Sequence, residues 1–124
     1  MRFEFAFDRN PEVGLRLAGI TRRNSAVVVD EQWFTARFGP WTVRTPLTNV
    51  VSASVGGPYR WWTAVGVRMS VSDRGLTFGS STRSGVCLTF REPVRGIDPW
   101  GLIRHPGLTV TVARPEDLVA DLGR

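Results

Sequence analysis

One stretch, residues 34–51, limits the fold of this chain more than any other. It reads Phe-Thr-Ala-Arg-Phe-Gly-Pro-Trp-Thr-Val-Arg-Thr-Pro-Leu-Thr-Asn-Val-Val. On each side of Gly39-Pro40, apolar residues alternate with Thr and Arg at a period of two, as they do in a half-buried strand. Gly-Pro is typical of a turn. The stretch therefore predicts a hairpin with one apolar face and one Arg/Thr face, which ends at Pro46 because proline has no N–H to donate.

Most of the remaining chain repeats this period of two. Further strands are predicted over residues 2–8, 26–29, 49–55, 66–73, 76–78, 86–90 and 108–112. In the first of them Phe3, Phe5 and Phe7 share one face. Residues 93–107 hold three prolines and three glycines, so they are expected to form a long irregular connection that is packed onto the domain.

Two segments carry helix signals. Asn10-Pro11-Glu12 offers an N-cap and a proline for a first helical turn, although the leucines that follow also fit a strand. The stronger signal is at residues 115–122, where Pro115 and two acids begin an amphipathic helix that Gly123 ends. Its apolar stripe is Leu118, Val119 and Leu122. The chain therefore predicts a mainly β fold, a single antiparallel bent barrel or sandwich of about seven to nine strands with one C-terminal helix.

The size of the chain fits one domain. Its 124 residues, 42% of them apolar, can build a core without staples. We expect a single domain over residues 1–124, with residues 1–25 as an N-terminal extension packed on it. Cys87 is the only cysteine, which excludes an internal disulfide. Acids interrupt the first apolar alternation, and the apolar runs are short, so we expect neither a signal peptide nor a transmembrane segment but a cytoplasmic protein.

The charge of the chain is basic and unevenly placed. The formal net charge is +5, and all 16 basic residues are Arg. Residues 58–95 contain six Arg and two acids and hold most of the excess. Basic charge of this kind fits an anionic membrane surface, an acidic protein or nucleic acid about equally.

The order of these elements resembles that of the pleckstrin-homology-like superfold, and most of all its small bacterial domains. Three pieces carry the resemblance: Arg37-Phe38-Gly39 in the hairpin, the Thr45–Val50 connection, and the ending Val110-Thr111-Val112 with Pro115-Glu116-Asp117-Leu118. It covers about residues 26–122 and implies a bent barrel with the C-terminal helix over one open end. Lipid-binding members use a Lys/Arg pair in the first hairpin. Arg37 and Arg44 lie near that place, but no Lys is present, so no functional residue is carried over.

The residues that could carry out catalysis are few. His105, the only histidine, stands in the irregular connection and is interpreted as a loop residue. Cys87 lies in the middle of a predicted strand and is interpreted as a small core residue. No nucleophile motif and no metal-ligand spacing is present. We therefore expect a protein that is not an enzyme and uses no metal or cofactor.

The leading hypothesis is a binding module that contacts a protein partner or an anionic membrane surface, with self-association through edge strands as a further expectation. Its tentative contact residues are Tyr59, Arg60, Trp61, Trp62, Arg68, Arg83 and Arg44. Aromatic residues beside Arg after a Gly-Gly-Pro break suit a bilayer interface or a protein contact, although ordinary packing also explains them. Two alternatives stay open: a small-ligand carrier or enzyme with a Trp-lined barrel mouth, and single-stranded nucleic-acid binding, which the absence of a recognition motif disfavours.

Overall fold

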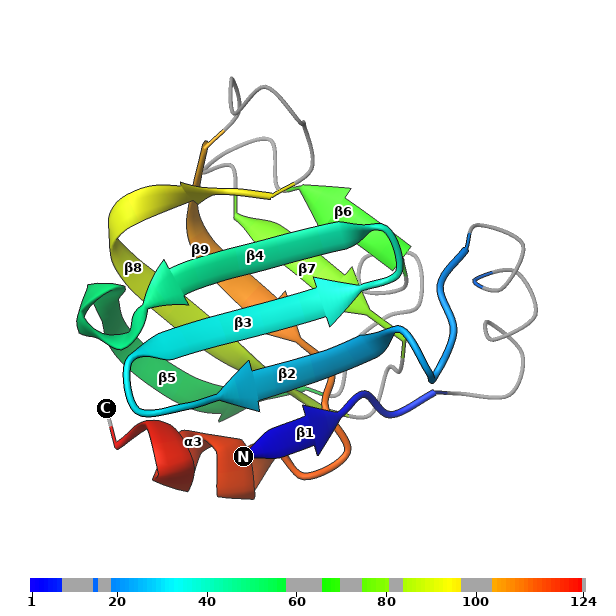
Figure 1. Ribbon diagram of the computed structural model, residues 1–124, viewed down its shortest axis with the longest axis horizontal. Coiled ribbons are helices and arrows are strands. Elements are labelled where there is room, and N and C mark those ends of the chain that lie inside the picture. Colours follow the sequence, from blue (N-terminus) through cyan, green and yellow to red (C-terminus); the bar gives the residue numbers. More distant parts are fainter. Residues whose placement is uncertain are drawn as a thin grey trace.

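The computed structural model describes residues 1–7, 15, 19–57, 66–69, 75–80, 84–96 and 104–123. Within these residues the chain forms nine strands, one 3-10 helix and one C-terminal helix (Figure 1). The elements are β1 (Arg2–Glu4), β2 (Ser25–Val29), β3 (Trp33–Phe38), β4 (Trp41–Pro46), η1 (Leu47–Asn49), β5 (Val50–Gly56), β6 (Gly66–Met69), β7 (Leu76–Gly79), β8 (Gly85–Arg95), β9 (Arg104–Val110) and α3 (Pro115–Leu122). The predicted mainly β fold with a C-terminal helix is thus confirmed.

The first sheet has the order β1-β2-β3-β4 and is antiparallel throughout. Its β3–β4 hairpin is the predicted one, since Phe38 pairs with Trp41 around Gly39-Pro40. Gly39 has φ +60, the value that the first position of a type II′ hairpin turn requires. A Cβ at this position would lie 2.7 Å from Cγ1 of Ile20. The turn therefore requires glycine for two reasons: the positive φ at this position, and the lack of room for a Cβ beside Ile20.

The second sheet has the order β5-β8-β9-β7-β6. It departs from the all-antiparallel expectation, because β7 and β9 are parallel. The reason lies in the order of the strands. β8 follows β7 along the chain but is not its neighbour in the sheet. β9 lies between β7 and β8 and pairs antiparallel with β8. Two reversals of direction make β9 run the same way as β7.

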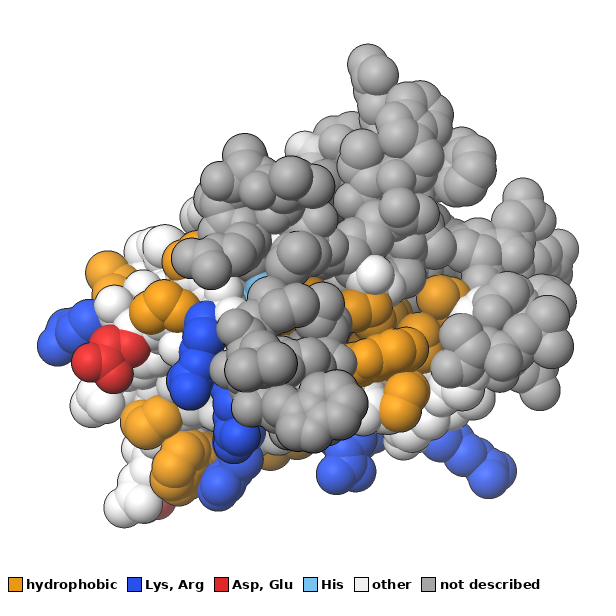
Figure 2. Space-filling view, turned by 90° about the horizontal axis from the view of Figure 1, so that it is seen from above, with side chains coloured by type: hydrophobic (Ala, Val, Ile, Leu, Met, Phe, Trp, Pro, Cys, Tyr) orange, Lys and Arg blue, Asp and Glu red, His pale blue; other side chains and the backbone are white. Residues whose placement is uncertain are grey.

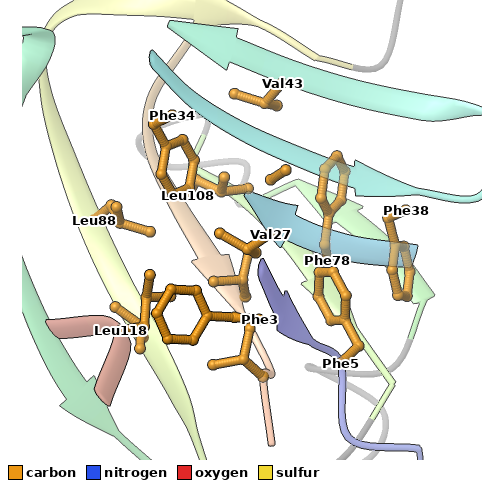
Figure 3. Packing of buried hydrophobic residues seen from close by; sticks show 14 of the residues in the cluster. Phe3, Phe5, Val27, Phe34, Phe38, Val43, Phe78, Leu88, Leu108 and Leu118 are labelled. Carbon is orange, nitrogen blue, oxygen red and sulfur yellow. The ribbon is translucent and has the colours of Figure 1, made fainter. Parts of the chain in front are cut away.

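The two sheets pack face to face over a core rich in phenylalanine. Figure 3 shows Phe3, Phe34 and Val27 of the first sheet on the same interior as Leu88 and Leu108 of the second, and all five are buried. A stacked pair also crosses between the sheets, since the rings of Phe38 and Phe78 lie 5.4 Å apart. The helix α3 packs against β5 and β8 at one end of this core, where Leu118 and Leu122 are buried as predicted (Figure 1). Whether the sheets form a bent barrel of the pleckstrin-homology-like kind stays a prediction.

The first residues of the chain join both sheets. Residues 2–4 pair with β2, but Phe5 then forms a bridge with Val112, which follows the second sheet. The N–H of Ala6 donates to the carbonyl of Thr111 at 2.9 Å. The predicted alternation of Phe3, Phe5 and Phe7 is correct, because all three are buried. The predicted helical turn after Asn10 falls outside the described residues except for Leu15, which is helical and buried.

The prediction of an irregular connection over residues 93–107 is wrong at both of its ends. β8 continues to Arg95 and β9 begins at Arg104. His105 is therefore a strand residue, and its side chain is completely buried. Residues 97–103 lie outside the described residues. The prolines and glycines of this segment interrupt the alternation of apolar and polar residues, so the sequence did not reveal the strand ends. The pairing of β8 with β9 is irregular in the same region.

Candidate anion-binding site

An interruption in the pairing of β8 with β9 shapes the candidate site. The strands pair at Thr89 with Gly107 and again at Val94 with His105, so residues 90–93 of β8 lie opposite Pro106 alone. Pro106 has no N–H for the ladder, and the extra length of β8 bulges away from β9. The bulge carries the sequence around Arg91 and Glu92 to the side of the molecule where β4 ends.

Asn49 of η1 holds this bulge in place. Its side-chain oxygen accepts a hydrogen bond from the N–H of Glu92 at 2.8 Å, and its amide nitrogen donates to the carbonyl of Glu92 at 3.0 Å. The same nitrogen lies 3.0 Å from Oγ1 of Thr45, whose side chain is buried in β4. One amide thus ties β4 and β8 together and fixes the distance between them at this point.

Beyond Asn49 the two strands leave a groove of about 520 Å³ between them, a volume within the range of ligand pockets in proteins. The charged residues along it are Arg44 on β4, Arg91, Glu92 and Arg95 on β8, and Arg104 on β9. All five are exposed. Figure 2 looks onto the side where β8 ends and β9 begins, and shows basic side chains in a row on its left half with an acidic one beside them. The described lining of the groove is strongly basic.

Arg95 and Arg104 are the most unusual pair in the groove. They stand directly opposite each other in the β8–β9 ladder, so their side chains leave the sheet on the same face. Like charges at opposite positions destabilise a sheet. Among the described residues, no ion pair neutralises either arginine. In the part of the chain that the structure describes, the fold therefore holds two positive charges together without an ion pair to either of them.

Arg44 approaches from the other side of the groove and is held by its neighbours on the first sheet. Its guanidinium lies 4.0 Å from the ring centroid of Trp33, a cation–π contact. The carboxylate of Asp30 is nearby, and it accepts hydrogen bonds from the N–H groups of Gln32 and Trp33 at 2.8 and 2.7 Å. These bonds hold the pKa of Asp30 below its ordinary value, and the charge of Arg44 lowers this pKa further.

Of the predicted contact residues whose side chains the structure describes, Arg44 belongs to the groove. Arg68 lies in β6, at the edge of the second sheet opposite Thr77, and only its backbone is described. The remaining five, Tyr59, Arg60, Trp61, Trp62 and Arg83, lie outside the described residues. Arg91, Arg95 and Arg104 were not predicted as contact residues. Arg95 and Arg104 lie within residues 93–107, which were predicted to form an irregular connection, and Arg91 lies between this segment and the strand predicted over residues 86–90. No strand face was therefore assigned to any of the three.

The two residues with catalytic potential lie apart, since Cys87 of β8 pairs with Thr109, four residues along β9 from His105. His105 is buried, whereas Cys87 is partly buried and its thiol lies 3.5 Å from Oγ1 of Thr109. The interpretation of Cys87 as a core residue is therefore wrong. Within the described part of the chain, no group of three His, Cys, Asp or Glu residues could hold a metal ion. Nor does any described helix have the length and apolar character needed to cross a membrane.

Comparisons of this chain with protein-family models, with curated proteins and with solved structures gave no match. The basic groove is therefore the feature from which a function can be argued.

Proposed function

We propose that this protein is a non-enzymatic binding module that takes an anionic group of its partner into the groove between β4 and the end of β8. The observation that carries the proposal is the pair Arg95 and Arg104, opposite each other and without an ion-pair partner among the described residues. A bound carboxylate or phosphate would convert this repulsion into charge-assisted hydrogen bonds, which are the stronger kind. We also propose that the two sheets form a bent barrel of the pleckstrin-homology-like kind.

A protein partner suits the groove better than a flat membrane surface. The arginines line a hollow between two strands, and a chain or a single anionic group can enter such a hollow, whereas a bilayer meets a protein over a broad face. The aromatic residues Tyr59–Trp62, on which the membrane hypothesis depends, lie outside the described residues. The carrier hypothesis has less support, because phenylalanine side chains occupy the described space between the sheets (Figure 3).

The test uses two double variants with the same change in net charge. Arg95→Gln/Arg104→Gln removes the opposed pair, and Arg2→Gln/Arg23→Gln removes two exposed arginines outside the groove. Binding of a poly-glutamate peptide, and of phosphatidylserine and phosphatidylcholine vesicles, is followed by tryptophan emission at low and moderate salt. We expect the groove variant to lose about tenfold or more in affinity for the peptide, since a hydrogen bond to a charged group contributes roughly 1.5–3 kcal/mol.

The control variant should bind the peptide within about twofold of the natural protein, after the general effect of net charge is removed by salt. Equal losses in the two variants would refute the groove as the site. Binding to phosphatidylserine vesicles alone, with the same dependence on Arg95 and Arg104, would move the partner from protein to membrane and keep the groove.

A further inference from the structure

The free edge of β4 adds a second recognition element to the groove. β4 is the last strand of the first sheet, and among the described residues it pairs only with β3. The two-residue loop makes Phe38 and Trp41 a pair that exchanges both of its hydrogen bonds. In an antiparallel ladder such pairs alternate, so Val43 and Thr45 also bond to β3, while the N–H and C=O groups of Thr42 and Arg44 point away from it. Two donors and two acceptors are thus presented at the groove.

This edge is suited to strand addition over a short length only. Pro46 has no N–H, and beyond it Asn49 closes the gap between β4 and β8 with its hydrogen bonds to Thr45 and Glu92. Toward the turn, β4 begins at Trp41, directly after Gly39-Pro40. An added strand would therefore centre on Thr42 and Arg44, the stretch of β4 that lines the groove.

The strands on the two sides of the groove, β4 and β8, show the same alternation of a buried valine and an exposed arginine. On β4, Val43 is buried and Arg44 is exposed; on β8, Val94 is buried and Arg95 is exposed. A strand entering between them would direct alternate side chains inward beside the two valines and outward beside the two arginines. Charge complementarity requires acids at the outward positions, because the described lining carries four arginines and one glutamate.

We infer that the groove binds an extended segment of another protein in which acidic and small apolar residues alternate, and that this segment pairs with the free edge of β4. The inference rests on the proposed function and specifies its ligand. Main-chain hydrogen bonds to Thr42 and Arg44 provide affinity, and alternate side chains provide specificity, as in other cases of β-strand addition. The arginines select acids on one face only, so the pattern of the segment matters as well as its charge.

Two synthetic peptides with blocked ends and identical composition test this pattern. The first is Glu-Val-Glu-Val-Glu-Val-Glu-Val and the second is Glu-Glu-Val-Val-Glu-Glu-Val-Val. An extended second peptide must turn half of its glutamates toward the apolar side, so we expect it to bind at least about tenfold more weakly. Amide hydrogen exchange gives the position: Thr42 and Arg44 should gain protection with the first peptide, whereas Val43, already bonded to β3, should change little.

A pair of variants tests the edge itself. Thr42→Pro removes an N–H that the first sheet does not use and should abolish binding of the alternating peptide, since proline is tolerated at free strand edges. Thr42→Val keeps this N–H and should bind as the natural protein does. Circular dichroism and thermal unfolding establish that both variants fold. If Thr42→Pro does not fold, the exchange measurement on the natural protein decides alone.

The outcomes separate this inference from the proposed function. Equal binding of the two peptides, or no added protection at Thr42 and Arg44, would overturn strand addition while leaving an arginine-dependent anion site intact. Binding of inorganic phosphate or anionic vesicles, with neither peptide bound, would overturn the occupant in the same way. If no anion binds in a manner that depends on Arg95 and Arg104, both proposals fail.

Discussion

Replacing Arg104 by Glu would turn the opposed arginine pair into an attractive pair. Arg95 faces Arg104 directly in the ladder, and opposite residues in a sheet have Cβ atoms about 5 Å apart. Two unit charges at about 5 Å in water interact by roughly 0.8 kcal/mol. Changing the sign of one charge therefore alters the interaction energy between residues 95 and 104 by roughly 1.6 kcal/mol before screening by salt. At about 0.15 M salt the Debye length is about 8 Å, which reduces this to about 0.9 kcal/mol.

We therefore expect Arg104→Glu to be more stable than the natural protein by about 0.5–1 kcal/mol, in line with measured cross-strand pairs. For a domain of this size that gain corresponds to roughly 2–5 °C in Tm. The same variant should lose binding of the anionic peptide. A rise in stability with a loss of binding is what a binding site produces when it holds like charges together for a ligand.

Thermal and urea unfolding at low and high salt measure the effect. Arg104→Gln should give about half of the gain, because it removes repulsion without adding attraction. The matched control is Arg2→Glu, which makes the same charge change at a strand position opposite Val28. Were Arg104→Glu no more stable than Arg2→Glu, or were its advantage independent of salt, the argument from opposed charges would be wrong.

Three further predictions concern the elements that position the groove. Asn49→Ala should destabilise the fold by about 0.5–1.5 kcal/mol, because the N–H and C=O of Glu92 exchange their hydrogen bonds to Asn49 for bonds to water; unchanged urea unfolding would contradict the role given to Asn49. Gly39→Ala should cost at least about 1–2 kcal/mol through its positive φ alone, with the approach to Ile20 adding to it; a neutral effect would exclude the type II′ turn. Asp30 has a lowered folded pKa, so its carboxylate contributes stability above its unfolded pKa of about 3.9 and loses that contribution as the pH falls through the folded value. Asp30→Asn should therefore be less stable than the natural protein at neutral pH and equal to it in acid, and a constant difference across pH would refute this.

The hairpin of the first sheet could be predicted from the sequence because it is local. Alternation alone places Phe34 and Val43 in the core, and Gly39-Pro40 marks the only turn that could join their strands. The C-terminal helix could also be predicted from the sequence, since the buried positions Leu118 and Leu122 repeat at helical spacing. In such segments the spacing of apolar residues along the sequence directly determines which side chains are buried in the fold.

The groove could not be predicted, because its parts are distant in the sequence. Asn49 meets Glu92 across 43 residues, and no local pattern indicates that an amide will bond to a particular peptide group. Bulges cause the same difficulty within strands. The register of β5 shifts between Val50 and Ser52, so Val50 is buried. Val51, which would share a face with the buried Ala53 in a regular strand, is 51% exposed. A period of two predicts a face only where the ladder is regular.

The most direct test of the account is a map of the arginine side chains on binding. Nitrogen-15 NMR spectra of the guanidinium groups are recorded while the alternating Glu-Val peptide is added. We predict that Arg91, Arg95 and Arg104 shift together and saturate, with Arg44 following, while Arg2, Arg23 and Arg114 stay unchanged. Shifts spread evenly over all of these arginines, or confined to those outside the groove, would contradict the assignment of the groove as the anion site.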